Sequence, residues 1–322
     1  MITILTHKKN KNIKTLIRNL IKYIFIFFTQ KLYLDINRFI QILKFSGHVD
    51  VTKSLINGLK ENNIVFNINP KLTKNYHRKL IVLSGYDELL MAINLKKRKI
   101  IDYLIAGPNI CILPSDIGDI FNSKEINTII TPSKWVSDSY AKDLPTICDK
   151  LKEWPAGVDI NYWKPLQKKT LEYVLIYIKK PFTLKKIKNY INFLNNKKIK
   201  FKIIYYGYYN NKNYLKVLQN SKYCIFFSIS ESQSIAMLES WSVGVPSLIH
   251  NNNLLNYKLK KIVCDTSPYL SKNTGFKFKN LNDFMEKILF YEKNYHKYNT
   301  REWVKQNLTD KLSSKILIDI IT

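Results

Sequence analysis

The sequence predicts an α/β protein built from two doubly wound domains that face a central cleft. From about residue 38, apolar segments typical of buried parallel strands alternate with segments of helical periodicity. The alternation is interrupted by a connector at residues 162–165 and a polar stretch at residues 167–170, and it starts again at residue 173. The length of 322 residues is sufficient for two ordinary α/β domains.

The first predicted domain spans residues 1–165, and its residues 1–37 are expected to form an atypical basic and apolar extension. Short apolar runs predict strands at residues 39–45, 64–68, 80–83, 110–113 and 128–130. Apolar residues at spacings of three and four predict helices at residues 51–61, around residues 89–93, and from Ser133 onward, where the serine suits the N-cap position. A turn is expected at residues 46–50.

The second predicted domain spans residues 166–322 and repeats the pattern. Its expected strands are residues 173–178, 201–206, 223–227 and 245–249. Its expected helices are residues 184–194, a short one around residues 215–218, one that follows residue 232, and closing helices at residues 284–291 and 303–321. Two doubly wound units joined by a short connector leave a cleft between them, which is a usual place for a ligand.

The chain is strongly basic, with 52 lysine and arginine residues against 24 aspartate and glutamate residues and a formal net charge of +28. Such a charge is typical of proteins that bind nucleic acid or anionic membranes. Only five of the basic residues are arginine, however, and abundant Lys, Asn, Ile and Tyr are also what A/T-rich codons produce. Because reading of bases and bidentate phosphate contacts favour arginine, we expect no nucleic-acid partner. Attraction to an anionic membrane surface still follows from the charge.

The cysteines and the N-terminal segment bear on location. The four cysteines lie far apart without a CxxC pair, which favours a reducing cytoplasm. The apolar segment 20–28 is shorter than the ~20 residues that a bilayer-spanning helix needs. This segment is either a buried helix or strand, or an interfacial segment that lies on anionic lipid. We therefore expect a cytoplasmic protein, and peripheral attachment to the inner membrane face is the open alternative. Residues 116–119 are interpreted as a turn, and no metal or cofactor is expected.

The most informative stretch runs from residue 230 to residue 246, between two strand-like segments. Glu231 and Glu239 are separated by seven residues and bracket the start of a helix at the carboxyl edge of a probable parallel sheet. Open α/β proteins bind ligands at that edge. Carboxylates accept hydrogen bonds from sugar hydroxyls, and the free amide groups at the beginning of a helix hold phosphate. The amide groups expected to do so belong to Ser232, Gln233, Ser234 and Ile235.

Together these motifs resemble retaining glycosyltransferases of the GT-B fold, the group-1 (family 4) class. The resemblance rests on the Glu-x7-Glu spacing followed by Gly-Val-Pro at 244–246, on Thr-Pro-Ser-Lys-Trp-Val at 131–136, and on Trp-Pro-Ala-Gly-Val-Asp at 154–159 with Trp-Lys-Pro at 163–165. It covers roughly residues 39–322. The resemblance implies an acceptor-side Rossmann-like domain, residues 1–165, and a Rossmann-like domain that binds a nucleotide sugar, residues 166–322.

The resemblance implies that the protein transfers a sugar from a nucleoside-diphosphate sugar to an acceptor hydroxyl with retained configuration. The acceptor would be a glycan or a lipid-linked molecule in cell-surface polysaccharide or lipopolysaccharide synthesis. Glu231 would accept hydrogen bonds from the donor sugar, and Glu239 would bind the ribose hydroxyls. The alternatives are a helix N-terminal anion for Glu231 and a solvated helix face for Glu239.

The family also places a basic pair after the first strand of the second domain, where it neutralises the leaving diphosphate. Lys179, Lys180 and Lys185 occupy this region here. The usual Gly-Arg is replaced by Ile-Lys, so which lysine fills the arginine position stays open. We expect Glu231→Ala and Lys185→Ala to abolish transfer.

Two residues of the first domain complete the expected site. Gly47 lies where the family has a glycine-rich turn that faces the donor phosphates. His48 would lie on the acceptor side as a polar or acid–base group, or it is a surface histidine of the turn. Two other functions remain open: a nucleotide-sugar epimerase or noncatalytic sugar-binding relative of the same fold, and a basic module that binds membranes or nucleic acid.

Overall fold

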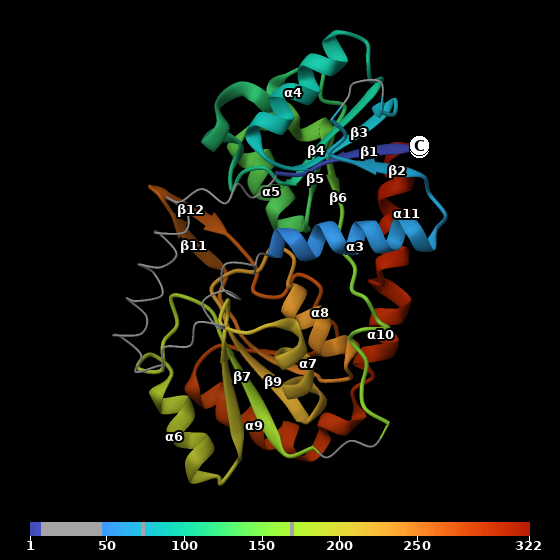
Figure 1. The fold of residues 1–322 in the computed structure, drawn as a ribbon. Helices are drawn as coiled ribbons and strands as arrows, with labels where there is room; N and C mark the ends of the chain where they lie inside the picture. The colour runs from blue at the N-terminus through green and yellow to red at the C-terminus, as the bar shows by residue number, and fades with distance from the viewer. Residues whose placement is uncertain (8–46, 72–74, 168–170) are drawn as a thin grey trace.

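The computed structural model describes residues 1–7, 47–71, 75–167 and 171–322. It contains two parallel sheets, each covered by helices, and helix α3 (Gly47–Glu61) runs between them (Figure 1). The strand expected at residues 39–45 and the apolar segment 20–28 lie outside the described residues. Among the described residues, no helix combines the length and the hydropathy that crossing a bilayer requires.

The first sheet has six parallel strands in the order β2-β1-β3-β4-β5-β6. The strands are β1 (Ile2–Leu5), β2 (Phe66–Ile68), β3 (Lys79–Ser84), β4 (Tyr103–Asn109), β5 (Thr128–Thr131) and β6 (Leu151–Glu153). The helices after α3 in this part of the chain are α4 (Tyr86–Lys97), η2 (Pro114–Asn122), α5 (Lys134–Asp143) and η3 (Pro145–Lys150).

The second sheet has five parallel strands in the order β13-β10-β9-β7-β8. They are β7 (Tyr173–Ile178), β8 (Phe201–Tyr205), β9 (Ser221–Phe227), β10 (Ser247–His250) and β13 (Gly275–Phe278), and β11 (Leu254–Tyr257) and β12 (Lys260–Val263) form an antiparallel hairpin. The helices are α6 (Lys188–Asn196), α7 (Asn211–Gln219), α8 (Ile235–Ser242), α9 (Leu281–Asn294), η4 (Tyr295–Lys297), α10 (Thr300–Asn307) and α11 (Asp310–Ile321).

Both sheets reverse their strand order beside their first strand. In the first sheet β1 lies between β2 and β3, and in the second sheet β7 lies between β8 and β9. The connections on the two sides of such a switch point leave in opposite directions, which opens a crevice at the carboxyl ends of the strands. The predicted α/β architecture of two doubly wound parallel sheets is therefore confirmed, and a ligand site is expected at the ends of β7 and β9.

The last helix of the chain returns to the first sheet. Leu317 and Ile321 of α11 are buried in one cluster with Ile4 of β1 and Leu55 of α3. Figure 1 shows α11 beside one end of α3. We call β1–β6 with α3, α4, α5, η2, η3 and α11 the first lobe, and β7–β13 with α6–α10 the second lobe. The domain boundary that the sequence predicts at residue 165 stays a prediction.

Three local predictions for the first lobe differ from the structure. Ile2–Leu5, within the expected extension, forms β1 inside the first sheet, and Ile4 is fully buried. The strand expected at residues 110–113 is wrong, since the strand is Tyr103–Asn109 and ends before that run. Its Gly-Pro pair at 107–108 is unusual in a strand and conceals it. The turn expected at residues 46–50 is wrong in its described part, because α3 begins at Gly47.

The second lobe follows the sequence more closely. Strands β7, β8 and β9 lie where their apolar runs predict them. The closing helix expected at residues 303–321 is two helices, because α10 ends at Asn307 and α11 begins at Asp310. Between them, Val158 and Thr309 form an isolated parallel bridge, so the chain crosses between the lobes at two adjacent places.

Candidate active site

A cavity of about 160 Å³ lies at the carboxyl edge of the second sheet, beside its switch point. It collects most of the site residues that the sequence predicts. Those among its lining residues are Lys179, Glu231, Ser232, Gln233, Ser234, Ile235 and Glu239.

Lys179 and Glu231 form an ion pair in this cavity. Lys179 directly follows β7, and Glu231 lies shortly after β9, which is the neighbouring strand. The Lys179 Nζ atom is 3.0 Å from both carboxylate oxygens of Glu231 and 5.0 Å from the ring centre of Tyr206. Burial alone would lower the pKa of Lys179, but the charge and the hydrogen bonds of Glu231 outweigh it, so the pKa is raised. The cavity therefore holds a fixed cation at the switch point.

The backbone of Glu231 is held from both lobes. Its N–H donates to the carbonyl oxygen of Asp265 at 2.8 Å, within the second lobe. Its carbonyl oxygen accepts a 3.0 Å hydrogen bond from Trp135 Nε1 of α5, which belongs to the first lobe. The position of the carboxylate therefore depends on the approach of the two lobes.

The start of α8 is suited to an anion. Ser234, the residue before the helix, has left-handed backbone angles of φ 51° and ψ 34°, which cost a non-glycine residue about 1 kcal/mol. Its Oγ atom is buried and has no hydrogen-bond partner among the described residues. The amide groups of Ile235 and Ala236 begin the helix, where no intrahelical acceptor is available, and the helix dipole adds positive potential there. Strain and an unpaired hydroxyl at a helix start are features of binding sites.

Gln233 joins this loop to the connector between the lobes. Its Oε1 atom accepts a 3.0 Å hydrogen bond from the amide of Ala156, and its Nε2 atom is buried without a partner among the described residues. Ser232 is exposed at the rim, whereas Ile235 packs against the apolar cluster of the first lobe. The loop before α8 thus contacts both the cavity and the first lobe.

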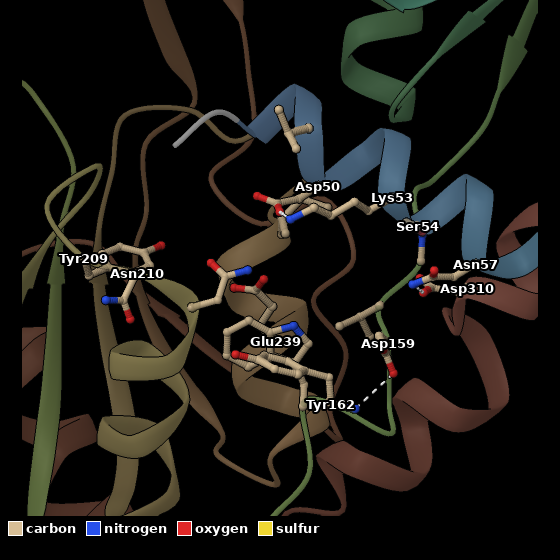
Figure 2. A pocket seen from close by; sticks show the side chains of 16 residues that line it. Asp50, Lys53, Ser54, Asn57, Asp159, Tyr162, Tyr209, Asn210, Glu239 and Asp310 are labelled. Atoms are coloured by element: carbon tan, nitrogen blue, oxygen red, sulfur yellow. Dashed lines mark hydrogen bonds and ion pairs between the residues drawn. The ribbon is translucent and has the colours of Figure 1, made fainter. Parts of the chain in front are cut away.

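A larger cleft of about 480 Å³ adjoins the small cavity. Asp50, Tyr209, Ile235 and Glu239 line both spaces, so the two form one continuous site. Figure 2 shows α3 on one side of this cleft and the second lobe on the other. Besides the shared residues, the cleft is lined by Val49, Lys53, Ser54, Asn57, Gly157, Val158, Asp159, Tyr162, Trp163, Asn210, Asn211 and Asp310.

Glu239 is a buried carboxylate without a hydrogen-bond donor among the described residues, and only 6% of its surface is exposed. Burial raises its pKa well above the usual range, the nearby charge of Asp50 raises it further, and Lys53 opposes this. Burial also raises the pKa of Asp50, which lies 3.7 Å from Lys53 Nζ and beside Asn211 of α7. The cleft therefore presents buried carboxyl groups that need hydrogen-bond partners from a ligand.

Of the remaining predicted site residues, two are lysines that follow Lys179 and two begin α3. Lys180 and Lys185 are exposed and line neither cavity. Gly47 and His48 are the first two residues of α3, and the next two residues, Val49 and Asp50, reach the cleft.

Sequence reasoning placed Gly47 and His48 at the site but missed the other residues of α3 and the loop after β8. Asp50 and Lys53 come from the former, and Tyr206 and Tyr209 from the latter. The position of both segments after expected strands places them at a sheet edge, which was a signal for a site. Neither segment carries a motif that would single out its residues. No group of three or more His, Cys, Asp or Glu side chains with metal-site spacing occurs among the described residues.

Comparison with known proteins places the fold. No protein-family model and no curated protein matches the chain. Solved structures do match it. WaaG, a glycosyltransferase involved in lipopolysaccharide biosynthesis, superposes with a TM-score of 0.55 at 11% identity and covers 99% of each chain. A glycosyltransferase from Rickettsia africae ESF-5 has a TM-score of 0.52 at 12% identity over 99% of this chain and 97% of the other.

A third structure, TarM, has a TM-score of 0.54 at 14% identity over 76% of this chain, and the chain spans only 55% of TarM. These identities show a shared fold. The GT-B class expected from the sequence is thereby confirmed, with two Rossmann-like sheets and the cleft between them.

Proposed function

We propose that the protein is a glycosyltransferase that uses a nucleoside-diphosphate sugar as donor and an acceptor hydroxyl as nucleophile. One observation carries the proposal. The Lys179–Glu231 pair, the free amide groups at the start of α8 and the buried Glu239 share one continuous cavity at the switch point of the second sheet. The fold shared with WaaG and the Rickettsia glycosyltransferase supports the same activity.

The chemistry of each part suits one part of such a donor. The diphosphate lies against the amide groups at the start of α8, where Lys179 neutralises the charge that develops on the leaving group. Glu231 accepts hydrogen bonds from hydroxyls of the donor sugar, and Glu239 accepts them from the ribose. No step requires a metal ion.

The proposed transfer retains the anomeric configuration. The acceptor oxygen attacks the anomeric carbon on the face that the diphosphate leaves. The new bond forms as the bond between the anomeric carbon and the phosphate oxygen breaks, and the acceptor proton passes to that phosphate oxygen. The fixed cation at Lys179 stabilises the departing anion, which is the requirement for this path.

The proposed acceptor is a cell-surface polysaccharide or lipopolysaccharide intermediate at the cytoplasmic face of the inner membrane. Two observations support it. WaaG is described as involved in lipopolysaccharide biosynthesis. The net charge of +28 favours approach to anionic lipid.

A donor screen tests the proposal. Thermal unfolding is followed with UDP-, GDP-, ADP- and CMP-sugars, since a true donor raises the melting temperature by mass action. The stabilising donor is then supplied in radiolabelled form with lipid and glycan acceptors. Label transferred to an acceptor supports the proposal. Isomerised donor or binding without transfer contradicts it in favour of an epimerase or a noncatalytic relative.

Three variants assign the cation. We expect Lys179→Ala and Glu231→Ala to lose at least about 100-fold in transfer rate, as removal of one stabilising group in an active site commonly does. Lys185→Ala decides between the sequence and the geometry. An equal loss in Lys185→Ala supports the role that the family resemblance implies, whereas near-normal turnover assigns the cation to Lys179. Normal turnover in Lys179→Ala and Glu231→Ala contradicts the site.

A further inference from the structure

The charged residues that line the larger cleft are mainly acidic, although the protein as a whole is strongly basic. Among the residues that the structure describes, the charged lining of the cleft consists of Asp50, Asp159, Glu239 and Asp310 and one cation, Lys53, in a chain of net charge +28. Such a lining offers phosphate little positive charge and suits hydroxyl groups, which both donate and accept hydrogen bonds. The phosphate therefore belongs at the start of α8, and the cleft beside it suits a neutral polyhydroxyl group.

Two of these carboxylates face the same space from opposite lobes. Asp50 is in the first turn of α3, and Glu239 is in the middle of α8. Each lines both the small cavity and the larger cleft. Figure 2 shows Asp50 and Lys53 on the α3 side and Glu239 below them, with the cleft between.

Their partners distinguish the two carboxylates. Glu239 is 94% buried and accepts no hydrogen bond from a described residue, so it lacks the donors that a buried carboxylate needs. Burial raises the pKa of Asp50, and its two polar neighbours, Lys53 with Nζ at 3.7 Å and Asn211, act in the opposite direction. A carboxylate has about four acceptor positions, so these two contacts leave room for a ligand hydroxyl. Both carboxylates can therefore accept hydrogen bonds from a ligand between them.

Asp159, by contrast, already accepts hydrogen bonds. Its Oδ1 atom accepts hydrogen bonds from the backbone amides of Asn161 at 2.9 Å and Tyr162 at 3.0 Å, which fixes the shape of the connector loop. Asp310 accepts from Asn57 Nδ2 at 3.1 Å through Oδ2, and its buried Oδ1 has no partner among the described residues. It lines only the larger cleft and not the small cavity that Asp50 and Glu239 share. Asp50 and Glu239 are the pair that a ligand in the cleft would bridge.

We propose that Asp50 is a second ribose-binding carboxylate, which the first lobe supplies opposite Glu239, so that the nucleoside of the donor bridges the two lobes. The inference rests on the proposed function and names a residue that the Glu-x7-Glu pattern does not contain. A ribose carries two adjacent hydroxyls, and each carboxylate accepts a hydrogen bond from one of them. Nucleotide binding then holds α3 against the second lobe.

The test pairs each side chain with one ligand hydroxyl. Calorimetry measures the dissociation constants of UDP, GDP and ADP and of their 2′-deoxy and 3′-deoxy counterparts. The proteins are the wild type, Asp50→Asn, Glu239→Gln and the control Glu61→Gln, which makes the same carboxylate-to-amide change at the exposed end of α3. Equal thermal unfolding without ligand shows that each variant is folded.

The wild type should bind one or more ribonucleotides at least about 10-fold more tightly than each deoxy analogue, the effect of one hydrogen bond to a charged group. In Asp50→Asn, the difference in affinity between the ribonucleotide and one of its deoxy analogues should disappear. In Glu239→Gln, the difference for the other deoxy analogue should disappear. The control Glu61→Gln should keep both differences in affinity.

Two results would overturn the inference and leave the proposed function in place. In one, Asp50→Asn binds all three forms of the nucleotide as the wild type does. In the other, it weakens all three by the same factor, which is the signature of a general structural or electrostatic role. If the wild type binds none of the nucleotides, the proposed function fails and the inference fails with it.

Discussion

Asp310 is a buried carboxyl at the junction of α11, α3 and the connector. It is 3% exposed, its amide donates to the carbonyl oxygen of Val158 at 3.3 Å, and its carboxylate accepts from Asn57. Burial raises its pKa to about 6, although Ser54 and Asn57 beside it act in the opposite direction. The folded protein therefore keeps this proton to a higher pH than the unfolded chain does. The stability that the protonated group contributes is complete below about pH 4 and is lost as the pH rises through about 6.

Asp310→Asn should remove this pH dependence. The difference between a pKa of about 6 and the usual 3.8 corresponds to roughly 3 kcal/mol, so the variant should gain up to that much stability over the wild type as the pH rises from 4 to 7. Urea unfolding at several pH values measures the difference. Asp119→Asn, an exposed aspartate, is the control. Parallel pH profiles for Asp310→Asn and the wild type would rule out the raised pKa as a source of instability.

At this scale the sequence identified the residues that a motif contains. The spacing of Glu231 and Glu239 and the position of Lys179 after a buried strand sufficed to predict that they gather, and the structure places all three around one cavity. Asp50 has no motif, and its location depends on the approach of α3 to the second lobe. The left-handed backbone conformation of Ser234 could not be predicted from the sequence either, because serine is not a residue that favours it.

At the scale of elements, two glycines allow the helices to meet. A Cβ atom on Gly58 of α3 would lie 2.0 Å from the carbonyl oxygen of Asp310, and one on Gly157 would lie 2.4 Å from that of Thr309. Backbone atoms at such distances cannot move aside as a flexible side chain can. The close contact between α3, the connector and the start of α11 therefore requires glycine.

Gly58→Ala should destabilise the fold even though alanine favours a helix by about 1 kcal/mol. The clash separates α3 from α11, and overpacking of this kind costs about 1–3 kcal/mol. Lys60→Ala, on the exposed side of the same helix, places an alanine in α3 without the clash and should change stability little, because lysine and alanine both favour a helix. Thermal unfolding of both variants measures the difference. A Gly58→Ala protein as stable as Lys60→Ala would show that α3 and α11 are not packed this closely.

The uninterrupted apolar runs of the second lobe were predictable as strands, and elements with mixed signals were not. Strand β7 is buried at all six positions, and its sequence is apolar throughout. Strand β4 contains Gly107 and Pro108 but pairs with β3 and β5, so tertiary pairing overrides local propensity there. The break at Leu308 within the last helical stretch is set by the crossing between the lobes rather than by a helix-breaking residue.

At the scale of the whole molecule, the β11–β12 hairpin of the second lobe reaches the first lobe. Tyr257 donates to Asp116 Oδ2 at 3.1 Å, and Lys258 pairs with the same carboxylate. Lys260 pairs with Asp143 and donates to Ser115 Oγ at 3.0 Å. The hairpin thus bridges the lobes through charged contacts, in addition to the packing of α3 and α11.

Reversing the charges of the hairpin should open the cleft. In Lys258→Glu with Lys260→Glu, the new carboxylates repel Asp116 and Asp143, so the lobes separate. Small-angle X-ray scattering should show a larger radius of gyration, and high salt should shift the wild type in the same direction. The double variant Lys261→Glu with Lys272→Glu makes the same change in net charge at exposed lysines. Identical scattering from both double variants would mean that the hairpin contacts do not hold the lobes together.

The sequence by itself determined the fold class and the edge of the second sheet at which the candidate site lies, because strand and helix periodicity and a short polar motif are local properties. The tertiary structure decided which side chains of the first lobe face that edge. It brought β1 into the first sheet, returned α11 to α3, and placed Asp50 opposite Glu239. These contacts join residues far apart in the chain. Their free energy comes from packing and burial between lobes, and no local pattern of residues encodes it.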